Sequence, residues 1–160
     1  MRAGVLILLG GLCFCACNQT PSVSQPIDYS HKAHIEKGLT CEVCHQSVET
    51  AAAATLPTNE TCLMCHQGAI TDSPEEEKVR QYAEKGEQIP WQRVYMVPDH
   101  VFFSHRRHVK AGQIACEECH GSIAKLTSAL TYPLVNQSMD WCLGCHRTRG
   151  ATTDCIHCHR

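Results

Sequence analysis

The pattern Cys-x-x-Cys-His occurs five times along this chain of 160 residues. In each copy two thiols stand three positions apart and a histidine follows directly. This is the attachment pattern of c-type haem, in which the thiols form thioethers to the porphyrin and the histidine ligates the iron. It predicts five covalently bound haem c groups. The thiols are Cys41, Cys44, Cys62, Cys65, Cys116, Cys119, Cys142, Cys145, Cys155 and Cys158. The expected proximal iron ligands are His45, His66, His120, His146 and His159.

Zinc is the competing interpretation, because paired cysteines also form zinc ribbons. The 17 residues between Cys44 and Cys62 fall within ribbon spacing. A zinc site does not explain a histidine after every pair, and later gaps of 22 and nine residues depart from ribbon spacing. The five repeats therefore favour haem over zinc or a disulfide framework.

The N-terminus has the features of an export signal. Arg2 precedes an apolar stretch from Val5 to Leu12, which is shorter than the ~20 residues of a membrane span. The run FCACN resembles a bacterial lipobox, so residues 1–16 are expected to be a lipoprotein-type signal peptide and Cys17 the lipidated first mature residue. An ordinary cleaved signal peptide is the alternative. We expect a lipid-anchored protein on the periplasmic side of a bacterial membrane, or a soluble periplasmic one in the alternative case.

The composition predicts a sparse fold in which haem supplies the core. Aromatic residues make up only 6% of the chain, so porphyrin faces must provide much of the buried apolar surface. We expect a mainly α and irregular structure, with short helices around the motifs and little sheet. The haem-free chain is expected to be largely disordered.

An internal duplication defines two modules. Residues 29–45, YSHKAHIEKGLTCEVCH, match residues 103–120, FSHRRHVKAGQIACEECH, with one extra residue in the second copy. Each copy is followed by a further motif, and the second half gains a third. The expected division is a dihaem module at 17–70, a linker with a surface helix at 71–101, and a trihaem module at 102–160.

The linker sequence predicts one helix, from about Pro74 to Lys85. Ser73 is a candidate N-cap, Glu76 a capping-box acid that is also spaced i,i+4 from Arg80, and Gly86 a stop signal. Its apolar residues are few, so we expect a solvated surface helix.

The segment after this helix is extended by pattern and is expected to bring four aromatic residues together against haem. They are Trp91, Tyr95, Phe102 and Phe103. The run Ala51 to Ala54 predicts only a neutral connection or one helical turn.

The remaining histidines determine what the irons can do. Of the 11 histidines, six lie outside the proximal set, and His157 sits inside the fifth motif, where it cannot reach the far side of its own iron. The expected distal ligands are His31, His34, His100, His105 and His108. Five distal candidates for five irons predict bis-histidine ligation, which leaves no position open for substrate. The methionine alternatives are Met64, Met96 and Met139.

The repeated SHxxH followed by C-x-x-C-H resembles the class III multihaem cytochromes c, the cytochrome c3/c7-like family, over nearly the whole mature chain. In that family the first histidine of the pair commonly ligates the haem of the next motif, and the second reaches a neighbouring haem. The resemblance thus implies that His31 serves the haem at Cys41 and Cys44, and His105 the haem at Cys116 and Cys119. His34 and His108 would cross to other haems.

Two further stretches, PWQRVYMVPDHVFFSHRRHV and SMDWCLGCHR, more narrowly resemble the pentahaem subunits of quinol-oxidising complexes of the alternative complex III type. The chain lacks the internal membrane anchor of those subunits, unless Cys17 lipidation replaces it. The resemblance implies an electron carrier, not an enzyme, whose partners are redox proteins or such a membrane complex. The alternative function is a multihaem reductase of nitrite or metal ions with one open haem. The sequence has no C-x-x-C-K variant of the kind seen in nitrite reductases, which counts against this alternative.

The net charge of -2 gives little electrostatic steering by the polypeptide itself. Haem propionates would make the loaded protein more acidic. The basic run HRRHVK is expected to pair with propionates, so the sequence favours no nucleic-acid partner.

Overall fold

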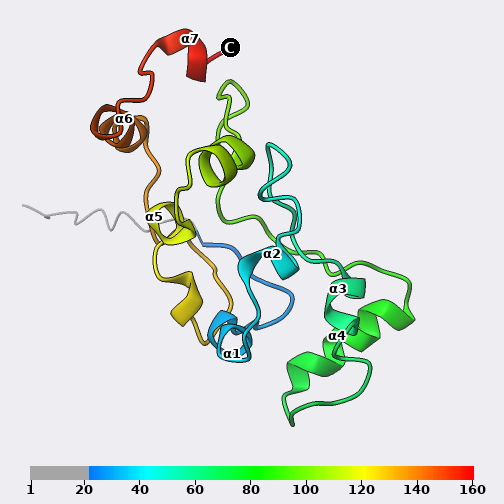
Figure 1. Ribbon diagram of the computed structural model, residues 1–160. Coiled ribbons are helices and arrows are strands. Elements are labelled where there is room, and N and C mark those ends of the chain that lie inside the picture. Colours follow the sequence, from blue (N-terminus) through cyan, green and yellow to red (C-terminus); the bar gives the residue numbers. More distant parts are fainter. Residues whose placement is uncertain (1–21) are drawn as a thin grey trace, which may run out of the picture.

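Short helices joined by irregular segments form the chain in the computed structural model, which describes residues 22–160 (Figure 1). Within that range no extended strand forms, and a single isolated antiparallel bridge joins Val101 to His159. The expected mainly α and irregular fold is therefore confirmed. The predicted signal peptide and Cys17 lie outside the described residues. The helices are α1 (His31–Ile35), α2 (Cys41–Cys44), α3 (Asn59–Leu63), α4 (Pro74–Glu84), η1 (Arg106–Ala111), α5 (Cys116–His120), η2 (Ile123–Lys125), α6 (Met139–Thr148) and α7 (Cys155–Cys158).

Every Cys-x-x-Cys-His motif overlaps a helix that contains at least its first cysteine: α2, α3, α5, α6 or α7. A helical turn closes each motif. The backbone N–H of His45 donates to the carbonyl of Cys41 at 2.8 Å, and the same bond joins His66 to Cys62 at 3.0 Å. Residues four apart lie on one side of a helix. The turn therefore presents the first thiol and the imidazole of a motif to the same space.

The two SHxxH copies form related turns ahead of their motifs. In the first copy Ser30 caps α1, its hydroxyl accepting from the N–H of Ala33 at 3.2 Å. In the second copy the Ser104 hydroxyl accepts from the N–H of Arg107 at 3.4 Å, and the turn continues as the wider π-helical η1. The duplicated serine thus begins the same local structure twice.

The extra residue of the second copy lies in the turn before its motif. Gly38 makes this turn in the first copy with φ +84°. In the second copy Gly112 has φ −84°, and the next residue, Gln113, takes φ 49°. A left-handed conformation is unfavourable for a residue with a Cβ, so the insertion moved the left-handed position from glycine to glutamine.

Helix α4 forms as predicted but is not fully solvated. Its Val79 is buried and packs with Ile27 and Ile89, and partly buried residues including Tyr82 and Trp91 surround them. The expected solvated surface helix is corrected here. A helix face with few apolar residues is buried here because Ile27 of the N-terminal segment packs against it.

The first turn of α4 also differs in detail from the expectation. Ser73 caps it, accepting from the N–H of Glu75 at 3.3 Å. Arg80 pairs with Glu77, with a 2.6 Å contact, and not with Glu76. The Glu76 carboxylate instead accepts hydrogen bonds from the N–H groups of Ile70 and Thr71 in the preceding loop.

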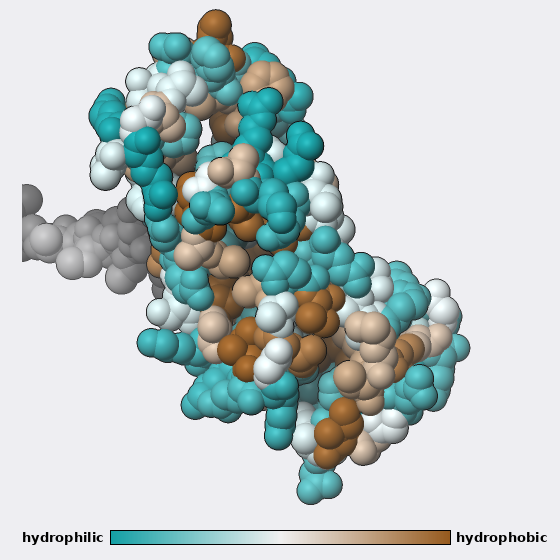
Figure 2. All heavy atoms as spheres, viewed as in Figure 1, coloured by the Kyte–Doolittle hydropathy of each residue, from teal (hydrophilic) through white to brown (hydrophobic). Residues whose placement is uncertain are grey.

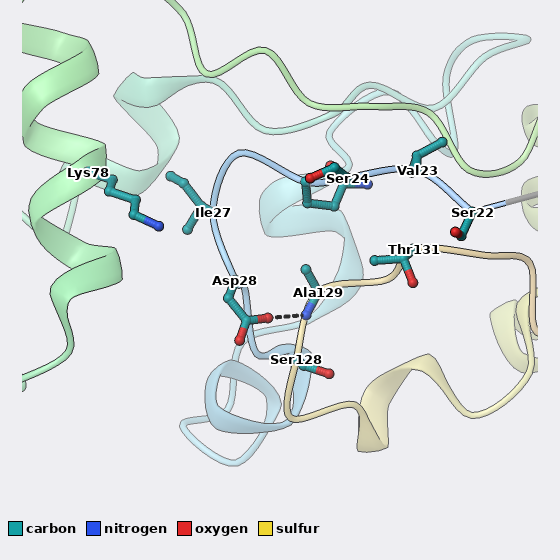
Figure 3. Close-up of a pocket in the computed structure, with 10 residues that line it drawn as sticks. Ser22, Val23, Ser24, Ile27, Asp28, Lys78, Ser128, Ala129 and Thr131 are labelled. Atoms are coloured by element: carbon teal, nitrogen blue, oxygen red, sulfur yellow. Dashed lines mark hydrogen bonds between the residues drawn. The ribbon is translucent and has the colours of Figure 1, made fainter.

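The N-terminal segment of the described chain crosses to the second half of the sequence. The N–H of Val23 donates to the carbonyl of Thr131 at 2.8 Å, and the N–H of Ala129 donates to the Asp28 carboxylate at 2.7 Å. A shallow pocket lies at this junction, with Lys78 at its side (Figure 3). None of the residues that line it is a motif cysteine or a candidate ligand, so it marks where the segments meet.

Few side chains in residues 22–160 are fully enclosed. The buried hydrophobic residues there are Ile27, Val48, Val79 and Ile89. Hydrophobic residues instead reach the surface along the middle of the molecule (Figure 2), and the Ile156 side chain in the fifth motif is 82% exposed. No helix in this part of the chain has the length and apolar character to cross a bilayer.

Candidate haem-binding sites

The structure brings each of four proximal histidines next to a different distal candidate. The ring centroids of His34 and His66 are 6.0 Å apart, and those of His108 and His146 are 6.1 Å apart. His105 and His120 are separated by 6.3 Å with planes inclined by 2°, and His100 and His159 by 5.6 Å with planes inclined by 16°. The two histidines of each pair are 15 to 59 residues apart in the sequence, so the fold brings them together.

These separations fit two imidazoles on one metal ion. A bond of about 2 Å from the metal to each ring nitrogen places the two ring centroids about 6 Å apart. Direct stacking of the rings in van der Waals contact would bring them closer. The paired histidines therefore leave the space that an iron ion needs.

His31 lies near His45, which also neighbours His105 and His120. Burial, followed by repulsion from the neighbouring His45 imidazole, lowers the pKa of His31 to about 4. Burial is also the main cause that lowers the pKa of His105 and of His120. All three are thus neutral at pH 7, which is the form in which histidine ligates a metal.

Hydrogen bonds at Nδ1 orient several of these rings. Nδ1 of His34 lies 2.8 Å from the carbonyl oxygen of Ser30, and Nδ1 of His108 lies 2.8 Å from that of Ser104. Nδ1 of His45 is likewise 2.7 Å from a backbone carbonyl. A carbonyl accepts only from a protonated Nδ1, so Nε2 carries the free lone pair. This arrangement is typical of histidines that ligate metals.

One aromatic residue in each SHxxH copy holds both histidines of the pair. Tyr29 stacks on His34 with centroids 4.5 Å apart and meets His31 edge-on at 4.8 Å. Phe103 repeats this, with His108 stacked at 4.7 Å and His105 edge-on at 4.8 Å. The residue before the serine thus belongs to the site, and its aromatic character in both copies is the sequence signal for that role.

The other aromatic residues do not gather as expected. Trp91 packs in the apolar cluster and donates through Nε1 to the carbonyl of Pro57 at 3.2 Å. Tyr95 lies edge-on to His120 with centroids 4.6 Å apart, and Phe102 lies under the Arg160 guanidinium. The expected single aromatic cluster is therefore wrong, because each ring serves a different part of the chain.

The alanine run, expected to be a neutral connection, contacts the second module. The carbonyl of Ala52 accepts from the backbone N–H of His105 at 2.8 Å and lies 3.1 Å from Nδ1 of the same residue. The carbonyl of Ala51 accepts from Arg106 at 3.0 Å. Backbone atoms from the first module thus orient a candidate ligand of the second, which no side-chain pattern could indicate.

The thiols show how the motifs follow one another in space. Burial, then the neighbouring Cys44 thiol, raises the pKa of Cys62 to about 11. Burial, then the neighbouring Cys41, raises the pKa of Cys116 to about 11. Burial again comes first for Cys119, which neighbours Cys145, and for Cys142, which neighbours Cys158. Neighbouring thiols therefore connect the second motif to the first, the first to the third, the third to the fourth and the fourth to the fifth.

The order agrees with the arrangement of the helices. Figure 1 shows α3, which begins the second motif, beside α4 at one end, and α6 and α7 at the other. Helices α2 and α5 lie between these ends. The five motifs thus form a row and do not surround one point.

The thiols and histidines do not form a zinc ribbon within residues 22–160, where no three or more metal-ligating side chains converge. His157, set aside as a ligand, lies 3.7 Å from the Asp154 carboxylate and is well exposed. The methionines considered as alternative ligands have side chains that are largely exposed: Met64, Met96 and Met139.

Comparison with known proteins points to the same cofactor. Residues 101–160 match the family described as cytochrome c7 and related cytochrome c. The match covers the C-terminal module, a smaller part of the chain than the sequence resemblance suggested. The chain is also 35% identical over 98 residues to the multihaem cytochrome c subunit of menaquinone reductase from Nitratidesulfovibrio vulgaris (strain Hildenborough).

By these two similarities the chain resembles the multihaem cytochromes c. Covalently bound haem c follows from that similarity and from the motifs. The alignment covers 60% of this chain and 45% of the relative, so the chain spans about half the length of the protein it matches.

Proposed function

We propose that the protein is a pentahaem electron carrier in which every haem iron has two histidine ligands. The proposed pairs are His45 with His31, His66 with His34, His120 with His105, His146 with His108, and His159 with His100. Bound haem c supplies reversible one-electron chemistry. The motif thiols hold the cofactor, and the Nδ1 hydrogen bonds orient the imidazoles.

The pairing of four proximal histidines with four different distal candidates is the observation that carries this proposal. His31 is the remaining distal candidate and lies near His45, the remaining proximal histidine. An iron with both axial positions filled cannot bind a substrate. The pairing therefore favours a carrier over a reductase with an open haem.

The row of motifs supports transfer from one end of the molecule to the other. The second motif is at one end and the fifth at the other, so partners would exchange electrons near Cys62–His66 and near Cys155–His159. Crossing ligands from the SHxxH pairs hold neighbouring sites together, because His31 and His34 lie on one short helix, α1.

The proposed setting is the periplasmic side of a bacterial membrane, with a lipid anchor at Cys17 and a quinone-linked respiratory complex as partner. The relative's name assigns it to a complex that reduces menaquinone, whereas the narrower sequence resemblance is to complexes that oxidise quinol. Both associate a multihaem subunit with a quinone-reactive complex, and they differ in the direction of electron transfer.

Haem content and carbon monoxide binding test the carrier proposal. The purified protein should carry five covalent haems by mass spectrometry, and its reduced form should not bind carbon monoxide because no iron has a vacant position. Carbon monoxide binding to the native protein would instead support the reductase with an open haem.

Native gels of mildly solubilised membranes test the partner. Haem staining should place the protein in a large assembly whose haems are reduced by added quinol or oxidised by added quinone. A haem band that runs alone and responds to neither would contradict a quinone-linked complex and leave a free carrier.

A further inference from the structure

The second motif differs from the others in what its histidine faces. Where Nδ1 of a proximal histidine meets a hydrogen-bond partner, at His45 and His146, that partner is a backbone carbonyl at 2.7 and 2.6 Å. Nδ1 of His66 is buried, makes no hydrogen bond, and lies 3.5 Å from the carboxylate oxygen Oε2 of Glu76. A protonated Nδ1 at this position faces a negative charge in place of a neutral dipole.

Glu76 is held in this position by the loop before α4. Its Oε1 accepts from the Thr71 hydroxyl at 2.5 Å and from the Thr71 N–H at 3.1 Å, and its Oε2 accepts from the Ile70 N–H at 2.8 Å. The side chains of Glu76 and His66 are only 11% and 18% exposed. A carboxylate that is fixed and shielded from water acts more strongly on its neighbour than an exposed one.

The only other histidine paired with a carboxylate in residues 22–160 provides a contrast. His157 and Asp154 are 3.7 Å apart with side chains 56% and 74% exposed, and His157 is not a candidate iron ligand. Of these two acids, Glu76 is the one that lies next to Nδ1 of a predicted iron ligand, His66.

We infer that Glu76 is a positioning residue that lowers the reduction potential of the haem held by Cys62, Cys65 and His66. A carboxylate behind Nδ1–H raises the basicity of the imidazole and favours the more positively charged, oxidised iron. The inference rests on the proposed haem ligation by His66. Because this motif stands at one end of the row, the end site gives up electrons more readily than it would with a carbonyl partner.

The test compares Glu76→Gln with Glu77→Gln. Both remove one negative charge from the first turn of α4, but Glu77 pairs with Arg80 and is 51% exposed. Redox titration followed by electron paramagnetic resonance should show one haem whose reduction equilibrium shifts at least tenfold in Glu76→Gln, which is about 59 mV for one electron. Glu77→Gln should leave every haem within threefold of the native value.

A second variant separates charge from loop structure. Thr71→Val removes the hydroxyl bond to Glu76 but keeps the carboxylate and its bonds from the N–H groups of Ile70 and Thr71, so the potential should shift much less than in Glu76→Gln. An equal shift in Thr71→Val and Glu76→Gln would overturn the inference, because disturbance of the loop would then explain both. Equal shifts in Glu76→Gln and Glu77→Gln would overturn it too.

Failure of the underlying function would look different. Mass spectrometry of the native protein would then show no haem attached to Cys62 and Cys65. Alternatively, the electron paramagnetic resonance spectrum would show no bis-histidine haem signal that disappears in His66→Ala. If five low-spin haems are present and Glu76→Gln shifts none of them, only the role of Glu76 is excluded.

Discussion

His100 is the distal candidate whose position depends most on tertiary contacts. It has no counterpart in the first module and is exposed. The C-terminus holds its segment in place: the N–H of Arg160 donates to the His100 carbonyl at 3.0 Å, and the N–H of Phe102 donates to the Cys158 carbonyl at 2.8 Å. These bonds set the ring beside His159 without the aromatic support that Phe103 gives to its neighbours.

Replacing His100 should therefore leave one axial position vacant on a single haem iron. In His100→Ala the iron at His159 loses its second ligand, so the reduced protein should bind carbon monoxide at one haem, seen as a new ferrous-carbonyl absorption band. His157→Ala is the matched control, since it removes a histidine inside the fifth motif that is exposed, lies near Asp154 and is not a candidate ligand. Carbon monoxide binding in both variants, or in neither, would contradict the assignment of His100.

The sequence was enough to name the candidate ligands, whereas the atoms that orient their rings could not be predicted from it. Counting and duplication selected His31, His34, His105 and His108, because the motif spacing is local. The carbonyl of Ala52 and the carboxylate of Glu76 act through contacts that depend on the folded loops. A backbone carbonyl has no sequence signal, and Glu76 appeared to be a helix-capping acid.

Helix α3 is fixed by a single buried amide at its first residue. Among the described residues, Asn59 is the buried polar one. Its Nδ2 donates to the carbonyl of Glu87 at 2.7 Å, and its Oδ1 accepts from the N–H of Ile89 at 3.1 Å. One side chain thereby joins the helix that carries Cys62 to the segment that follows α4.

Asn59→Ala should destabilise this end of the molecule. It leaves the buried N–H of Ile89 without a partner, at a cost of about 1–3 kcal/mol, and removes the bond to the partly buried carbonyl of Glu87. The holoprotein should therefore unfold at a clearly lower denaturant concentration by circular dichroism. Asn136→Ala, at an exposed asparagine, should leave the midpoint unchanged. A midpoint for Asn59→Ala equal to that of Asn136→Ala would show that the amide does not support the fold.

At the level of elements, local signals predicted bounds but not packing. The serine cap, the proline after it and Gly86 defined α4 within one residue of its observed span, Pro74–Glu84. Its burial depends on Ile27 and Ile89, which reach it through the tertiary fold. A helix with few apolar residues could not be recognised as part of the core until the segment that covers it was known.

The two halves of the molecule are joined by contacts that cross the modular division of the sequence. The predicted modules at 17–70 and 102–160 meet where Lys110 pairs with Glu49 at 2.8 Å and where Ser30 approaches the carbonyl of Leu126 at 3.4 Å. These contacts are polar and mostly solvent-accessible, and exposed ion pairs contribute little stability. Another source of cohesion must hold the row of motifs together.

The proposed haem groups would supply this cohesion, which leads to a prediction for the chain without them. The few buried hydrophobic residues cannot offset the conformational entropy of so many irregular segments. Each proposed iron, by contrast, joins two segments through its axial ligands, as His100 is joined to His159 across the C-terminal half. A variant with serine at all ten motif cysteines should therefore show no cooperative unfolding by circular dichroism, while the haem-loaded protein melts cooperatively. Cooperative melting of the haem-free variant would mean that the polypeptide contacts alone determine this fold.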